Sequence, residues 1–149
     1  MSIKFAMIKP SIWRRKFGNL SPDAKLLAIF LMTNEMVVMI GIYHIPIFNM
    51  SLGIGLDETR VRELLYELKE NDICMYDEPS MFIWVKDMVL TQVGRSPNEN
   101  QLKGVLAHIT RLQEDEQCVF VKPFLERYKE IYSLPEFVEE LNYSSLAYS

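Results

Sequence analysis

The hydrophobic pattern is most regular between residues 41 and 85. Residues 42–45 read as a short strand, and Pro46 begins a short helix over 47–52 that Gly53 and Gly55 end. Asp57 is a good N-cap for a helix to Glu70. Within that helix, apolar residues follow the i, i+3, i+4, i+7 spacing of a buried stripe: Val61, Leu64, Leu65 and Leu68.

A hairpin is predicted directly after this helix. Asp77–Ser80 forms the turn between the two strands. Along these strands, two sets of residues alternate: Ile73, Met75, Met81, Ile83 and Val85 in one set, and Cys74, Tyr76, Phe82 and Trp84 in the other. Strand, helix, helix and hairpin in this order predict a winged helix-turn-helix with a small β-hairpin wing and C-terminal helices. The fold class expected is therefore α+β, mainly α.

Segments before residue 41 give weaker signals. Ser21 and Pro22 form a strong helix start, as N-cap and first helical residue, and the helix continues to about Met32. Residues 3–8 alternate loosely and predict a short strand. Residues 36–40 fit either a strand or a buried loop, and residues 13–19 fit an irregular or single-turn segment.

A polar, breaker-rich segment at 94–98 predicts a domain boundary. We expect a winged helix-turn-helix domain over 1–95 and a helical extension over 98–149, with helices at 100–114, 122–132 and 135–141. The serine-rich end, 142–149, is expected to fray. The apolar face of the 100–114 helix either packs on the first domain or forms a dimer seam. An aromatic-rich set is a candidate self-association surface: Phe120, Phe124, Tyr128, Tyr132 and Phe137.

Composition limits the class of protein. The 149 residues contain 49% hydrophobic residues, enough for a core, yet no apolar run approaches the roughly 20 residues of a membrane span. There is no signal-peptide pattern, and Cys74 and Cys118 have no disulfide-framework spacing, so both are expected to be free thiols. We therefore expect a cytoplasmic protein without membrane contact.

Charge is unevenly distributed along the chain. The formal net charge is −4, but residues 1–34 carry six bases and one acid, a sum of +5, which leaves −9 for the rest. A basic N-terminal segment on an acidic body is a pattern that favours an anionic partner, although a solvated basic turn with no partner explains it equally simply.

Several stretches resemble the N-terminal domain of phage and prophage replication initiators of the replisome-organiser type, which is related to primosomal helicase-loading proteins. The similarity covers residues 9 to about 112. It is carried by Lys9-Pro10-Ser11-Ile12-Trp13, Phe17, Leu20 to Leu27, Leu31 to Asn34, Gly41 to Pro46, Ile83-Trp84-Val85, Gln92, Ser96-Pro97-Asn98 and Gly104-Val105. The resemblance implies a winged-helix domain that binds duplex DNA or self-assembles as a homodimer or higher oligomer. It also implies a replicative helicase or its loader as a partner.

The 57–70 helix supplies candidate DNA contacts, because a recognition helix directs side chains to base edges and phosphates. These candidates are Thr59, Arg60, Arg62, Tyr66 and Lys69. From Asp57 to Asp72, however, six acids face three bases, and the hairpin turn adds Asp77 and Glu78. Acids repel phosphates, so a solvated mixed-charge helix is the competing interpretation.

The better phosphate-binding candidates lie near the N-terminus: Lys9, Arg14, Arg15 and Lys16. Neighbouring Trp13 is interpreted as core or hinge packing rather than as a base-stacking platform, and Trp84 as an anchor of the wing to the core.

No pattern indicates catalysis. His44, His108 and the two cysteines lack metal-ligand spacing, and Gly53-Ile54-Gly55 lacks the lysine and hydroxyl residue of a phosphate loop. We expect no catalytic residues, no metal and no cofactor. The function predicted is a non-enzymatic DNA-binding replication protein. The alternatives are a winged-helix module for protein interaction or self-assembly, and a transcriptional regulator.

Overall fold

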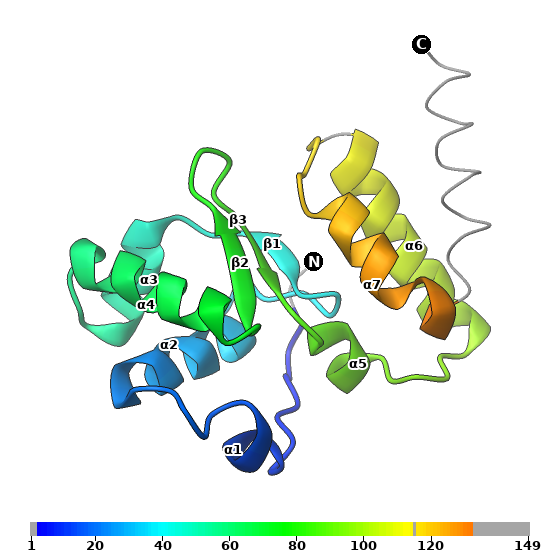
Figure 1. Ribbon diagram of the computed structural model, residues 1–149. Helices are drawn as coiled ribbons and strands as arrows, with labels where there is room; N and C mark the ends of the chain where they lie inside the picture. The colour runs from blue at the N-terminus through cyan, green and yellow to red at the C-terminus, as the bar shows by residue number, and fades with distance from the viewer. Residues whose placement is uncertain (1–2, 115, 133–149) are drawn as a thin grey trace. The chain divides into compact units, whose positions relative to one another are not determined.

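The computed structural model describes residues 3–114 and 116–132 and is α+β, mainly helical (Figure 1). The chain forms two compact units, residues 1–92 and 93–149, which are described separately. The division between them lies just before the breaker-rich segment 94–98.

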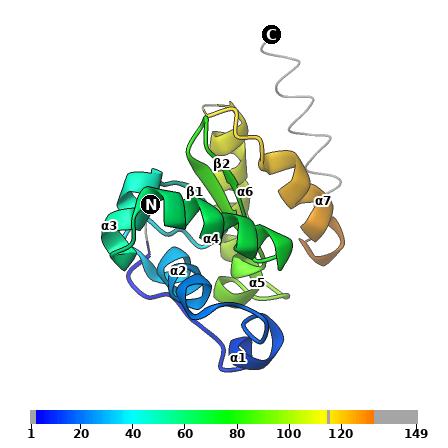
Figure 2. The same cartoon turned by 60° about the vertical axis from the view of Figure 1, so that its left-hand side comes forward.

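In the first unit, three helices pack together and a small sheet lies beside them (Figures 1 and 2). Helices α2, α3 and α4 contact one another, and α4 also contacts strand β2. In chain order the elements are α1 (Ile12–Arg15), α2 (Pro22–Thr33), β1 (Ile42–His44), α3 (Ile47–Ile54), α4 (Glu58–Glu70), β2 (Cys74–Asp77), β3 (Phe82–Val85) and α5 (Met88–Gln92).

The caps expected from the sequence are present. The Ser21 hydroxyl accepts a hydrogen bond from the Ala24 amide at the start of α2, and the Asp57 carboxylate accepts one from the Arg60 amide at the start of α4. Gly55 ends α3 in the left-handed conformation, with φ 75°. Because this conformation is costly for residues with a Cβ, glycine suits the three-residue connection from α3 to α4.

The sheet has three antiparallel strands in the order β1-β3-β2. His44 pairs with Phe82 across β1 and β3, and Asp77 pairs with Phe82 across β2 and β3. The hairpin is confirmed. Every residue of β3 is buried, so both of the alternating sets of this central strand are covered, Phe82 and Trp84 as well as Ile83 and Val85.

Gly41 fixes the approach of β1 to β3. Its φ is +80°, and a Cβ built there would lie 2.6 Å from the Val85 carbonyl oxygen and 2.9 Å from the Met88 Cβ. The Val85 amide donates to the Gly41 carbonyl at 2.8 Å. Only glycine combines this backbone conformation with so close a contact.

The structure corrects one expectation for the irregular segments, decides a second and adds a helix. Residues 3–8 form no strand: the Ile3 amide bonds to the Val37 carbonyl, and the backbone of Met7 bonds to the side chain of Gln92 instead of to a strand. Residues 36–40 form a loop whose apolar side chains are partly buried. Helix α5 was not anticipated, because five residues are too few to show a helical period.

The second unit contains α6 (Glu99–Glu114) and α7 (Val121–Tyr132), which pack on each other. The proposal of an adhesive aromatic surface is wrong for four of its members, because they are buried: Phe120, Phe124, Tyr128 and Tyr132. Phe137, the helix expected at 135–141 and the end at 142–149 lie outside the described residues. Whether the α6 face packs on the first domain or forms a dimer seam stays a prediction.

Candidate nucleic-acid interface

Helix α4 presents its candidate contacts on the side opposite its buried stripe. Val61, Leu64, Leu65 and Leu68 are buried, as the spacing predicted. On the other side Thr59, Arg62, Tyr66 and Lys69 are exposed, and Arg60 is half-buried. We call α4 together with the hairpin turn 77–81 the helix–hairpin surface.

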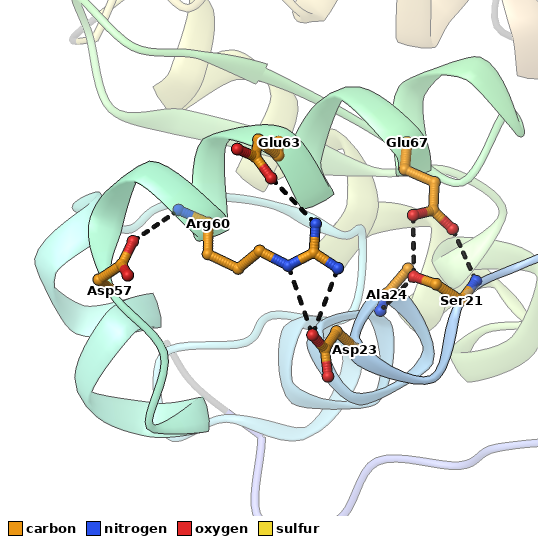
Figure 3. A network of polar contacts seen from close by, with 7 residues as sticks. All are labelled: Ser21, Asp23, Ala24, Asp57, Arg60, Glu63 and Glu67. Carbon is orange, nitrogen blue, oxygen red and sulfur yellow. Dashed lines mark hydrogen bonds and ion pairs between the residues drawn. The ribbon is translucent and has the colours of Figure 1, made fainter.

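Arg60 is held by carboxylates of the fold (Figure 3). Its Nη1 lies 3.0 Å from Glu63 Oε2, and its Nη2 lies 3.3 Å from Asp23 Oδ2 at the start of α2. The hydrogen bond to Glu63, and then that to Asp23, raise the pKa of Arg60. The guanidinium therefore links α4 to α2 and would have to leave two acids to reach a phosphate.

Arg62 is paired with the hairpin turn. Its Nε and Nη2 donate to Glu78 Oε1 at 3.0 Å and 2.8 Å. The hydrogen bond and the charge of Glu78 raise the pKa of Arg62. This ion pair joins α4 to the hairpin turn.

Glu67, which the sequence did not single out, makes the second polar link between α4 and α2 (Figure 3). Its carboxylate accepts hydrogen bonds from the Ser21 amide at 2.7 Å and from the Ser21 hydroxyl at 2.8 Å. Ser21 thus caps α2 and binds α4 at once. Such a contact leaves no local sequence signal, because its partners are 46 residues apart.

The basic residues near the N-terminus are in a different situation. Lys9, Arg14 and Arg15 are exposed and have no ion-pair partner within 3–114 and 116–132. Lys16 is paired, with its Nζ 3.2 Å from Asp87 Oδ2. Residues 3–16, which include Lys4 as a further exposed cation and no acid, are called the N-terminal segment below.

Helix α1 and the hairpin turn lie at opposite ends of the first unit. Both views place helix α1 at the lower end and the turn between β2 and β3 at the upper end (Figures 1 and 2). The arginines of α1, Arg14 and Arg15, therefore lie at the other end of this unit from the hairpin turn that pairs with Arg62.

Trp13 is not a core residue, because 58% of it is exposed, although its ring packs against Phe17. Phe5 is 90% exposed and Met7 59%. Trp84, in contrast, is buried in β3, as expected of an anchor, with Lys86 Nζ 5.5 Å from the centre of its ring. The mixture of apolar and basic residues, with no acid, between Lys4 and Arg15 is the sequence signal that points to the exposed aromatics.

Burial shifts the pKa of two side chains that could otherwise react, Cys74 and His108. Cys74 is fully buried, which raises the pKa of its thiol to about 12 and disfavours the nucleophilic thiolate. Burial also lowers the pKa of His108. No helix within the described residues is long and apolar enough to cross a membrane.

Comparisons with known proteins assign no family to this chain. No protein-family model, curated protein or solved structure matches it. The resemblance to replication initiators therefore stays a prediction.

Proposed function

We propose that residues 1–92 form a winged helix-turn-helix and that the protein is a non-enzymatic DNA-binding replication protein of the phage or prophage initiator type. The order of elements from α2 to β3 supports the fold, as does the three-residue connection between α3 and α4. The position of β1 beside β3 gives the hairpin a third strand, which a small hairpin needs for stability.

The observation that supports DNA binding is the exposure of Lys9, Arg14 and Arg15, which have no ion-pair partner in the described part of the chain. Attraction to duplex DNA comes mainly from cations that displace counterions from phosphates. Lys9, Arg14 and Arg15 are available for this, whereas Arg60 and Arg62 already neutralise acids of the fold. The replication role itself, with recruitment of a replicative helicase or loader, comes from the resemblance alone.

A salt titration of binding to a duplex tests this proposal. Three phosphate contacts would give a slope of about −2.7 in log K against log salt, or about a 40-fold loss for a fourfold rise in salt. Arg14→Ala with Arg15→Ala should reduce the slope by about 2 on every duplex sequence. The matched control is Lys103→Ala with Lys122→Ala, which removes the same charge from exposed positions of the second unit.

Two outcomes would contradict the proposed DNA contact. If the protein does not bind a duplex at low salt, or if the control weakens binding as much as the arginine variant, the N-terminal segment is not a DNA contact.

A second candidate function is protein interaction or self-assembly through the helix–hairpin surface. It is favoured by Tyr66, which is 64% exposed beside arginines that the fold has neutralised. Exposed tyrosines are typical of protein interfaces. Sedimentation over a range of concentrations tests this: self-association that Tyr66→Ala weakens would support it, and a monomer throughout would exclude self-assembly.

A further inference from the structure

The N-terminal segment combines exposed aromatic rings with exposed cations. Phe5 follows Lys4, and Trp13 precedes Arg14 and Arg15, with no acid between them. Folded proteins seldom leave a tryptophan and a phenylalanine this exposed without a partner, because burying each ring releases a large apolar area from water.

The Trp13 ring is held in place although it is exposed. It meets Phe17 edge to face, with ring centres 5.3 Å apart and planes at 88°, and Phe17 is fully buried. Trp13 therefore has one fixed contact with the core, and the rest of its surface faces solvent. A ring fixed in this way loses little freedom when a flat ligand stacks on it.

The backbone of the segment is also anchored, by contacts that do not involve Lys4, Lys9, Arg14 or Arg15. Met7 exchanges two hydrogen bonds with the Gln92 side chain, at 3.0 Å and 2.8 Å. Lys16 is bound to Asp87, and the Ile3 amide to the Val37 carbonyl. The backbone between these contacts is thus fixed at several points. It carries four exposed cations: Lys4, Lys9, Arg14 and Arg15.

Exposed aromatics interleaved with cations match single-stranded nucleic acid better than the alternatives. In a duplex the base faces are stacked inside, out of reach of Phe5 and Trp13, whereas single strands offer them to aromatic side chains. A membrane-surface helix separates an apolar face from a basic face over several turns. Helix α1 has four residues, and its Trp13 adjoins Arg14.

We propose that the N-terminal segment binds single-stranded DNA or RNA, with Trp13 and Phe5 stacking on bases and the four free cations contacting phosphates. The proposal rests on the proposed function in that it assigns the same cations, and it adds the aromatic contacts and the preference for single strands. A protein that acts where a duplex is opened would meet both forms of DNA.

The test measures affinity of the full chain for three probes: an oligothymidylate of about 15 nucleotides, an oligouridylate of the same length, and a matched duplex. Trp13→Ala should weaken single-strand binding about 5- to 100-fold and leave duplex binding unchanged. Phe5→Ala, at a position that is 90% exposed and cannot affect the core, should act in the same direction. Phe48→Ala is the matched control, because Phe48 on α3 is 61% exposed and lies outside the segment.

Fluorescence separates stacking from a structural role. Trp84 is buried, so quenching of tryptophan emission by the oligonucleotide should come from Trp13. The quenching should therefore be lost in Trp13→Phe, although this variant should retain much of the affinity. Weakening of single-strand and duplex binding to the same extent by Trp13→Ala, or no effect on either, would overturn the stacking proposal. Duplex binding through Arg14 and Arg15 would survive that result.

Vesicles rich in anionic lipid complete the test. Binding to vesicles without binding to either oligonucleotide would overturn the proposal and assign the segment to a membrane surface.

Discussion

The N-terminal segment and the helix–hairpin surface contain the same kinds of basic residue and use them differently. Arg60 and Arg62 lie within 3.3 Å of carboxylates from α2, α4 and the hairpin turn. Arg14 and Arg15 are exposed on a segment without acids. In one region the cations hold elements of the fold together, and in the other they remain available to a ligand.

This difference teaches that residue type and position on a helix are poor guides to a nucleic-acid contact. A recognition-helix arginine binds phosphate or base only if the fold leaves it free, since exchange of one anion for another gains little. The two regions should therefore respond differently to mutation. Changes in the helix–hairpin region should mainly alter the free energy of unfolding, and changes in the N-terminal segment should mainly alter the affinity for nucleic acid.

The largest effect is expected at Gly41, where the chain entering β1 approaches the end of β3. Gly41→Ala should lower the free energy of unfolding by about 2–5 kcal/mol, because it adds both left-handed strain and a clash with the Val85 carbonyl. Gly55→Ala is the control: φ is also positive there, but nothing lies within 4 Å of the added Cβ, so about 1–2 kcal/mol is expected. Urea unfolding followed by circular dichroism compares them, and equal losses would show that the close contact at Gly41 is not limiting.

The link between α4 and α2 gives the next effect. Glu67→Ala leaves the Ser21 amide and hydroxyl without their acceptor, and should cost about 1–2 kcal/mol at this partly buried site. Glu70→Ala removes the same charge from an exposed position of the same helix and should change stability by less than about 0.5 kcal/mol. The same unfolding measurement decides, and similar losses in the two variants would mean that the charge rather than the hydrogen bonds matters.

Local signals predicted the elements well and their partners poorly. Ser21, Asp57 and the leucine stripe of α4 act within one helical turn or on one face, so their spacing in the sequence is enough to predict them. The contacts that join elements lie beyond any spacing rule, because Arg60 and Asp23, Arg62 and Glu78, and Glu67 and Ser21 are 16 to 46 residues apart.

Burial of single side chains was the least predictable property. Trp13 and Trp84 both invite the prediction of a core residue, yet only Trp84 lies in a central strand that is covered on both faces. Trp13 lies on a single turn whose core position is already filled by Phe17. Which of two aromatic residues takes a core position depends on packing in three dimensions.

Removing the partner of a paired arginine should increase the affinity of the helix–hairpin surface for DNA. Glu78→Gln removes the acceptor charge at the hairpin turn and frees Arg62, so duplex affinity should rise about five-fold at low salt. Glu35→Gln makes the same change in net charge at an exposed position away from any arginine pair, and should raise affinity less. Anisotropy of a labelled duplex measures both, and equal gains would attribute the effect to net charge alone.

The smallest effect tests the comparison inside the N-terminal segment itself, because Lys9 and Lys16 differ in pairing but not in type. Lys9 is exposed and without an ion-pair partner in the described part of the chain, whereas Lys16 lies 3.2 Å from Asp87. Lys9→Gln should weaken duplex binding about three-fold and reduce the salt slope by about 1, while Lys16→Gln should weaken it less than about two-fold. A larger effect of Lys16→Gln would mean that Lys16 leaves Asp87 when DNA arrives. An ion pair in the free protein would then not exclude a DNA contact, and Arg60 and Arg62 would become candidates again together with Lys16.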